Sequence, residues 1–200
     1  SIDPVRFIGN HSSGKMGFEI AKAAANLGAK VILIAGPTNQ VVTHSFIYTI
    51  GVVSAEEMYE KVHEYYSDVD VAILAAAVAD YKPKNKVTHK IKKKDASLTI
   101  ELEPTKDILA SLGAIKEHQL LVGFALETND ELTNAKAKLQ RKNLDFIVLN
   151  SLQDKGAGFS TDTNKITIID KQLNENWYDL KSKSEVAKDI IQEVIIKLNA

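Results

Sequence analysis

The chain has 200 residues, a net charge of −1, no cysteine and a hydrophobic fraction of 44%. This length predicts one α/β domain over residues 1–200 with enough apolar residues for a sizeable core. The near-neutral charge excludes a generally basic nucleic-acid binder. Without cysteine there is no disulfide framework, thiolate nucleophile or cysteine metal site, which is compatible with the cytoplasmic location that we expect. No apolar run approaches about 18 residues, so we expect no membrane span.

A glycine-rich turn precedes the first predicted helix. Residues 9–17 read Gly-Asn-His-Ser-Ser-Gly-Lys-Met-Gly, and an apolar helical pattern continues through Leu27. Such a turn presents unpaired N–H groups and the positive end of a helix dipole to anions. Met16 stands where a P-loop needs a Mg²⁺-binding hydroxyl, and Ser12 stands where a dinucleotide fingerprint has its first glycine. The pattern therefore predicts a phosphate-binding turn without assigning its ligand.

Strands and helices alternate along the rest of the chain. Short apolar runs indicate strands buried on both faces, and apolar residues at helical spacing indicate amphipathic helices. This alternation predicts a Rossmann-like, doubly wound, mainly parallel sheet with an antiparallel edge at residues 163–170. The other predicted strands are residues 30–35, 46–53, 69–77, 98–102, 120–124 and 146–149, and the later helices are residues 54–65, 107–116, 130–142 and 184–198.

Ligands of such sheets bind beyond the carboxyl ends of the strands, which places the turn, Asp80, Phe124 and Asn150 around one crevice. Asp80 either caps its strand or binds a ribose or Mg²⁺ there. Phe124, which we predict to be the last residue of its strand, is either core or packs on a base. Lys138 and Lys142 share one helix face, and taken alone they indicate a solvent-facing pair.

Residues 82–97 form a polar excursion, the flap, directly after the strand that ends near Asp80. A run of like charges is usually a solvated loop. At the ligand edge of a sheet, however, lysines are suited to close over phosphates. Stacking aromatics are missing beyond Tyr81, so a small polyphosphate fits better than nucleic acid. The flap lysines are Lys82, Lys84, Lys86, Lys90, Lys92, Lys93 and Lys94.

Three other classes of enzyme fit the residues less well. A nicotinamide-dependent reductase lacks its ribose-binding acid, because no Asp or Glu lies between Glu19 and Glu56. A P-loop kinase is disfavoured by Met16, and a hydrolase by His11, which has no third residue to orient it. An NAD(P)-dependent reductase and a non-catalytic nucleotide-binding relic remain the alternatives.

Seven motifs follow one another along the chain, at residues 3–8, 10–17, 75–81, 90–93, 123–128, 142–145 and 158–164. Together they resemble one family, the phosphopantothenoylcysteine synthetases of coenzyme A biosynthesis, in their bacterial CTP-dependent form. The resemblance implies a ligase in which CTP activates the carboxylate of 4′-phosphopantothenate as an acyl-CMP and releases pyrophosphate. The amine of L-cysteine then displaces CMP.

The resemblance also implies partners, a cofactor and a missing element. It implies Mg²⁺ with unassigned ligands, a homodimer whose flap contributes to a shared site, and a possible fusion to a flavin-dependent phosphopantothenoylcysteine decarboxylase domain. It implies neither nucleic-acid nor membrane binding. The family has an opening strand upstream of its Asp-Pro motif, so we expect the first strand of the sheet to be missing from this numbering.

Site residues follow from the resemblance position by position. Asn10 is expected to hold the acyl-CMP intermediate with Arg6 nearby, and Lys90 to serve the activation step. Lys106 stands where the family has proline. Lys138 and Lys142 become nucleotide contacts, in place of the solvent-facing interpretation. The full nucleotide-binding set is Ser12, Gly14, Asp80, Lys90, Lys106, Asp107, Ile108, Leu109, Phe124, Lys138 and Lys142, with the backbone of Ala76 and Ala77 shaping the pocket.

Overall fold

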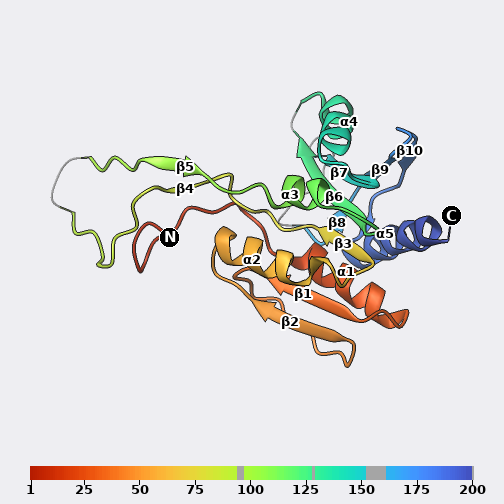
Figure 1. The fold of residues 1–200 in the computed structure, drawn as a ribbon, viewed down its shortest axis with the longest axis horizontal. Coiled ribbons are helices and arrows are strands. Elements are labelled where there is room, and N and C mark those ends of the chain that lie inside the picture. The colour runs from red at the N-terminus through yellow and green to blue at the C-terminus, as the bar shows by residue number, and fades with distance from the viewer. Residues whose placement is uncertain (94–96, 128, 152–160, 200) are drawn as a thin grey trace.

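A computed structural model describes residues 1–93, 97–127, 129–151 and 161–199 (Figure 1). Its main sheet has five strands in the order β10-β9-β7-β6-β3. The parallel strands are β3 (Val71–Leu74), β6 (Leu120–Glu127) and β7 (Phe146–Ser151). The antiparallel strands β9 (Ile166–Asp170) and β10 (Glu175–Trp177) complete one side. The predicted α/β class is therefore confirmed, and residues 166–170 do pair antiparallel. They lie between β7 and β10, however, so β10 forms the edge that we predicted at residues 163–170.

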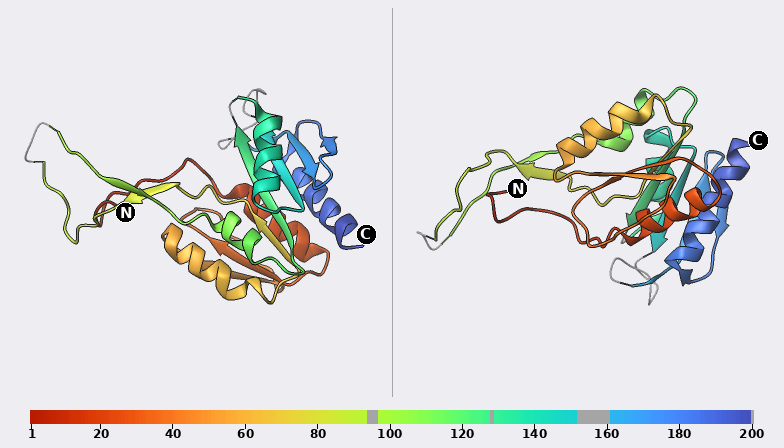
Figure 2. Two further views of the ribbon diagram at one scale, coloured as in Figure 1. Left: turned by 45° about the horizontal axis from the view of Figure 1, so that its top comes forward. Right: turned by 90° about the horizontal axis from the view of Figure 1, so that it is seen from below.

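Helices cover both faces of this sheet (Figure 2). One face packs against α1 (Lys15–Asn26) and α5 (Lys183–Leu198), which also contact each other. The other face packs against α2 (Ala55–Tyr66), α3 (Ile108–Ala114) and α4 (Glu131–Arg141). Neighbouring residues of a strand point to opposite faces, so β6 contributes to both cores, and this explains its continuous apolar run.

A second, smaller sheet is formed by β1 (Val31–Ala35) and β2 (Ile47–Gly51), which pair in parallel. Both α1 and α2 contact β1, so this sheet also lies between helices. In the described part of the chain, β1 pairs only with β2, and β3 pairs only with β6. The two parallel units are thus separate hydrogen-bonded sheets in this structure, and not the one continuous sheet that the alternation predicts.

Two predicted strands have different bounds for tertiary reasons. The strand predicted at residues 69–77 ends at Leu74, because the following segment leaves the sheet and bonds to loops. The strand predicted at residues 98–102 is largely wrong: β5 (Leu102–Pro104) begins where it was expected to end. It pairs antiparallel with β4 (Tyr81–Pro83) and forms a two-stranded ribbon at the base of the flap.

The flap and the N-terminal segment extend together from one side of the body (Figures 1 and 2). The backbone N–H of Lys84 donates to the carbonyl of Glu101 at 3.0 Å, which continues the β4–β5 ribbon outward. The N–H of Val87 donates to the carbonyl of Ile2 at 3.4 Å, which ties the N-terminal segment to the flap. No helix among the described residues is long and apolar enough to cross a membrane.

The C-terminal helix begins at a capping box that the sequence reading missed. The hydroxyl of Ser182 accepts from the N–H of Glu185 at 3.3 Å, and the Glu185 carboxylate accepts from the N–H of Ser182 at 3.1 Å. These bonds satisfy two otherwise unpaired donors at the helix start. Just before it, β11 (Lys181–Ser182) pairs antiparallel with β8 (Thr163–Asn164).

Candidate functional site

The predicted phosphate-binding turn leads directly into α1. Gly14 is the N-cap residue, with a left-handed φ of 74° and no side-chain cap. A Cβ at this position would lie 3.1 Å from Oγ1 of Thr38, whose hydroxyl donates to the carbonyl of Ser13 at 2.8 Å. The left-handed conformation therefore favours glycine, and a Cβ here would also press on the Thr38 hydroxyl. Across from the turn, a polar pocket of about 390 Å³ is lined by Ser12, Ser13, Pro37, Thr38, Asn39 and Gln40.

Asn10 ties this turn to the segment that follows β3. Its side-chain amide donates to the carbonyl of Val78 at 3.1 Å. Ala76 and Ala77 lie just before Val78, between β3 and β4. The bond therefore brings the turn to the carboxyl end of β3, as the rule for parallel sheets predicts.

Asp80 is joined to the segment before α3 through Thr105. The Thr105 hydroxyl donates to the carbonyl of Ala79 at 2.7 Å, and its backbone N–H donates to the carbonyl of Asp80 at 2.9 Å. The next residue, Lys106, pairs with Glu56 of α2 at 2.6 Å and lies 4.5 Å from the ring centroid of Tyr59. This hydrogen bond from Lys106 lowers the pKa of Glu56.

Asp107 links the start of α3 to the end of α4. One carboxylate oxygen caps α3 by accepting from the N–H of Ala110 at 3.0 Å, and the other lies 2.8 Å from Nζ of Lys142. The Lys142 side chain is only 12% exposed, so this pair is partly shielded from water. Burial raises the pKa of Asp107, but the bonds from Lys142 and Ala110 outweigh it and hold the pKa below its usual value.

Lys138 reaches from α4 to the middle of β6. Its ammonium donates to the carbonyl of Phe124 at 2.8 Å. Burial and, secondarily, the neighbouring charge of Lys142 lower the pKa of Lys138. Phe124 is not the last residue of its strand, because β6 continues to Glu127; the prediction on this point is wrong. Its side chain packs beside the α1–α5 core.

The junction after α4 holds Lys142 close to α3. Asn143 ends the helix with a left-handed φ of 53°, and its side-chain amide donates to the carbonyl of Gly113 at 3.0 Å. A Cβ on Gly113 would lie 2.0 Å from the carbonyl oxygen of Lys142. Lys116 donates to the carbonyl of Asn143 at 2.8 Å and pairs with Asp145 at 2.9 Å. The motif at residues 142–145 thus has a structural role that the sequence reading did not assign.

The flap lysines differ in their surroundings. Lys84 pairs with Glu101 at 2.7 Å, and Lys82 lies 3.6 Å from Glu103 and 3.5 Å from Glu56. Acidic residues on the returning strand therefore neutralise the lysines at the base of the flap. The sequence prediction considered only the lysines of the outgoing segment and did not include these acids. Lys90 lies farther out, next to Ile91. Lys94 lies outside the described residues, as do Thr128, Gly158 and Phe159 of the motifs.

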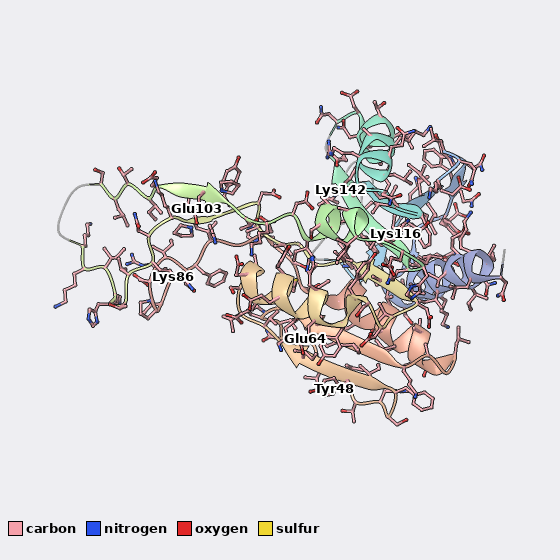
Figure 3. All side chains as sticks on the ribbon, viewed as in Figure 1. Tyr48, Glu64, Lys86, Glu103, Lys116 and Lys142 are labelled. Carbon is pink, nitrogen blue, oxygen red and sulfur yellow. The ribbon has the colours of Figure 1, made fainter. Side chains whose placement is uncertain are left out.

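The structure brings most of the expected nucleotide-binding residues together at the carboxyl end of β3 and beside β6. Their cluster joins the body lysines Lys138 and Lys142 to Asp107 and Asp80, whose charges act on Lys138. Lys90 and Arg6 are not part of it, because the flap points away from the body of its own chain. Figure 3 shows this separation, with Lys86 on the flap and Lys142 on the body.

Asn150, at the carboxyl end of β7, is engaged elsewhere. Its side-chain oxygen accepts from the amide of Asn164 at 3.0 Å. Two residues that the sequence reading overlooked are Glu56, described above, and Asp3, which is 2% exposed. The Asp3-Pro4 pair gave a signal, since Asp before proline favours a side-chain-bonded turn.

Together, the two-faced α/β body, the glycine turn and the lysine–carboxylate cluster define a domain suited to a phosphorylated ligand. Residues 1–198 match the family described as DNA/pantothenate metabolism flavoprotein C-terminal domain, and the chain belongs to that family. The phosphopantothenoylcysteine synthetase family that the motifs resemble is thereby confirmed.

Known relatives agree with this membership. The chain is 47% identical over 194 residues to the coenzyme A biosynthesis bifunctional protein CoaBC of Bacillus subtilis (strain 168), covering 97% of this chain and 48% of that protein. It is 55% identical over 195 residues, 97% of this chain, to a protein of an unknown prokaryotic organism named cysteine/cysteine sulfinic acid decarboxylase, of which it covers 54%. The chain thus spans about half the length of the curated relatives it matches.

A solved structure extends the likeness to three dimensions. The crystal structure of the C-terminal domain of CoaBC matches with a TM-score of 0.84 and 43% sequence identity. The match covers 100% of this chain and 90% of that chain.

Proposed function

We propose that this chain is a phosphopantothenate–cysteine ligase that uses CTP and acts in coenzyme A biosynthesis. CTP and 4′-phosphopantothenate form an acyl-CMP and pyrophosphate, and the amine of L-cysteine then attacks the acyl carbon. The bond from that carbon to the phosphate oxygen breaks, and CMP leaves. The observation that carries the proposal is the match over residues 1–198 to the family.

The body lysines would bind the nucleotide phosphates. Lys138 and Lys142 are already placed by a carbonyl and a carboxylate, so little reorganisation is needed when phosphate oxygens replace these partners. The partial burial of Lys138 strengthens its attraction for an anion, because water screens it less. Ile108 and Leu109, behind the Asp107 cap, would contribute backbone contacts, and Phe124 would lie beside the base.

A Mg²⁺ ion fits this site only as a companion of the nucleotide. Among the described residues, no three carboxylate or histidine side chains form a group that could hold a metal ion. Mg²⁺ often binds through one or two carboxylates and substrate phosphates, and Asp80 is the carboxylate that we assign to it. The ion would supply charge neutralisation on the triphosphate.

Asn10 would act on the acyl group. Its bond to the Val78 carbonyl uses one amide hydrogen and orients the side chain, which leaves the amide's other hydrogen and its oxygen for the intermediate. The backbone of Ala76 and Ala77 would form the adjoining wall. At the turn, the N–H of Gly14 donates to the Ser12 hydroxyl at 3.3 Å, and a phosphate of the substrate would replace this long hydrogen bond.

We further propose a homodimer in which the flap of one protomer completes the body site of the other. The flap points away from its own body, so Lys90 needs another body to meet a bound nucleotide. Large apolar side chains are exposed on the same projection, including Phe7 at 74%, Val5 at 63% and Leu98 at 55%. A monomer rarely exposes such a group of side chains without a partner. Analytical ultracentrifugation should show a dimer.

We also propose that the two parallel units, β2–β1 and β3–β6–β7, are parts of one doubly wound arrangement. This proposal is supported by the helices around β1. On one side α1 contacts β1 and also packs on the α5 face of the main sheet, and on the other side α2 contacts β1 and packs on the face covered by α3 and α4.

A single-turnover assay tests the ligase. With CTP and 4′-phosphopantothenate alone, pyrophosphate should be released while CMP stays in the intermediate, and adding L-cysteine should release CMP. Omitting 4′-phosphopantothenate is the control and should abolish pyrophosphate release. Pyrophosphate release that does not need 4′-phosphopantothenate, or oxidation of NADPH by the protein, would contradict the proposal.

A further inference from the structure

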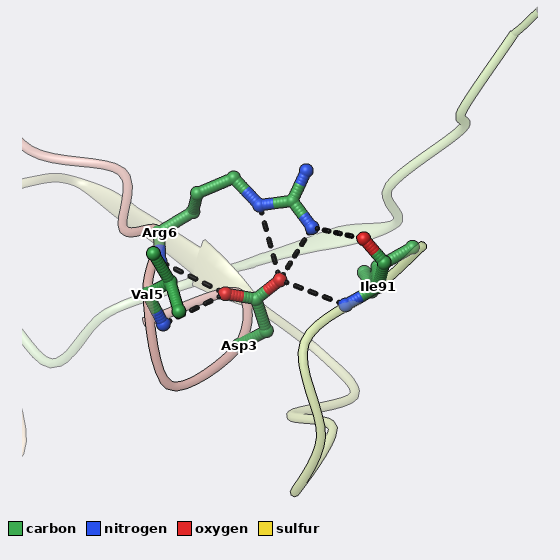
Figure 4. A network of polar contacts seen from close by, with 4 residues as sticks. All are labelled: Asp3, Val5, Arg6 and Ile91. Carbon is green, nitrogen blue, oxygen red and sulfur yellow. Dashed lines mark hydrogen bonds and ion pairs between the residues drawn. The ribbon is translucent and has the colours of Figure 1, made fainter. Parts of the chain in front are cut away.

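Asp3 is a buried carboxylate at the centre of a polar network outside the nucleotide-binding cluster (Figure 4). One of its oxygens accepts from the backbone N–H groups of Val5 and Arg6, at 2.8 and 2.9 Å. The other accepts from Nε of Arg6 at 3.0 Å, from Nη2 of Arg6, and from the backbone N–H of Ile91 at 3.1 Å. The two oxygens therefore have separate tasks: one folds the N-terminal turn, and the other binds the flap.

Both the backbone N–H and the backbone carbonyl of Ile91 are hydrogen-bonded to the N-terminal segment. Asp3 accepts from the N–H of the Lys90–Ile91 peptide, while Nη2 of Arg6 donates to the carbonyl of Ile91 at 3.0 Å. Because a peptide group is planar, fixing its N–H constrains the Cα atom of the residue before it, which is Lys90. We call these contacts among Asp3, Arg6 and Ile91 the clasp.

Among the described residues, few other contacts fix this part of the flap; one of them is the long bond from the N–H of Val87 to the carbonyl of Ile2, at 3.4 Å. The β4–β5 ribbon pairs only three residues of each strand, and the Lys84–Glu101 pair extends it by one step. An exposed ion pair of this kind contributes little. The clasp is different, because its carboxylate is buried and its hydrogen bonds are charge-assisted.

We propose that Asp3 is a positioning residue. It acts through the Lys90–Ile91 peptide and holds the backbone of Lys90 in the position from which the Lys90 side chain contacts the bound nucleotide. This inference rests on the proposed ligase function. Asp3 itself touches no substrate. Arg6, expected to lie near the intermediate, has in this structure the additional task of closing the clasp.

Asp3→Asn tests the proposal with little change in shape. An amide keeps one acceptor oxygen for the N-terminal turn but presents an NH₂ group to the three donors of Arg6 and Ile91. The matched control is Glu101→Gln, which removes one negative charge from the same projection and breaks the Lys84 pair without touching the clasp. Neither substitution alters the body lysines.

Two measurements are made on each variant. Hydrogen exchange followed by NMR reports on the Ile91 amide, and the amides of β7 in the same spectrum report whether the fold is intact. Single-turnover pyrophosphate release with CTP and 4′-phosphopantothenate reports on the activation step. For Asp3→Asn we expect exchange at Ile91 to be about tenfold faster or more, since a charge-assisted bond is lost. Pyrophosphate release should slow by a similar factor, with the KM for CTP near that of the wild type. Glu101→Gln should match the wild type in both measurements.

Unchanged exchange at Ile91 would overturn the clasp. Faster exchange with unchanged pyrophosphate release would overturn the positioning of Lys90. If the wild type releases no pyrophosphate, the ligase function fails, and the exchange data still decide whether the clasp exists. If hydrogen exchange in β7 is also faster in Asp3→Asn, a second variant is needed. Ile91→Pro removes the N–H that donates to Asp3 and leaves Asp3 unchanged. Pyrophosphate release at the wild-type rate in Ile91→Pro would overturn the proposal.

Discussion

Gly113 is the position where the packing of the site leaves least room for change. A Cβ there would lie 2.0 Å from the carbonyl oxygen and 2.9 Å from the carbonyl carbon of Lys142. Both are backbone atoms, so no rotamer change relieves the overlap, and α3 and the end of α4 must separate. Overpacking of this kind costs up to about 3 kcal/mol. Alanine in a helix returns about 1 kcal/mol, so Gly113→Ala should lose about 2 kcal/mol of unfolding free energy.

Thermal and urea unfolding measure this loss. For a chain of this size, about 2 kcal/mol corresponds to a Tm lower by roughly 4–8 °C. Gly17→Ala is the matched control, because Gly17 is also helical but a Cβ added to it would meet nothing within 4 Å. It should gain about 0.5–1 kcal/mol. A Gly113→Ala protein as stable as the wild type would refute the close contact and, with it, our explanation of how Lys142 is held beside Asp107.

Two further predictions concern protonation. The hydrogen bond from Arg6 holds the pKa of Asp3 well below its usual value, so the stability that Asp3 contributes is complete above its unfolded pKa and is lost as the pH falls towards the folded pKa. The difference in unfolding free energy between wild type and Asp3→Asn, measured with urea, should therefore be largest above about pH 5, begin to shrink below about pH 4, and vanish only as the pH approaches the folded pKa of Asp3; a constant difference would contradict this. Burial lowers the pKa of Lys138, and a bound polyphosphate should raise it again, so CTP binding should take up a proton at alkaline pH and weaken as the pH rises. Calorimetry in buffers of different ionisation enthalpy measures this uptake, and its persistence in Lys138→Met would assign the proton elsewhere.

Apolar patterning predicted the body of the fold well. The runs around Leu121 and Val148 are apolar because helices cover both faces of their strands, so the sequence alone identifies them as buried. The ends of strands were harder to predict. Residues 75–78 are as apolar as the strand before them, yet β3 ends at Leu74, and the side chain of Asn10, far away in sequence, donates to the carbonyl of Val78. Apolar patterning alone does not reveal that boundary.

The sequence allowed us to predict which residues belong to the candidate site, but not how these residues are arranged in space. The family resemblance located the body lysines and Lys90, whereas nothing in the local sequence indicates that the flap extends away from the body. The acids that neutralise the base of the flap lie on the returning strand, and their pairing with Lys82 and Lys84 depends on the β4–β5 register. Asp3 was assigned no role because its bond to the backbone N–H of Ile91 joins residues 88 positions apart, which local sequence does not reveal.

The most direct test of a site shared between two protomers mixes two inactive variants, Asn10→Asp and Lys90→Ala. After subunit exchange, half of the dimers should carry one variant of each kind. If the flap of one protomer completes the body site of the other, each such dimer has one intact site, and the mixture should recover about a quarter of the wild-type ligase activity.

A second mixture serves as the control. Wild type mixed with the Asn10→Asp, Lys90→Ala double variant should retain about a quarter of the activity if sites are shared, and about half if each flap serves its own body. Recovery of about a quarter in the first mixture is the result that we predict. If the first mixture recovers no ligase activity and the control mixture retains about half of the wild-type activity, the shared site is contradicted.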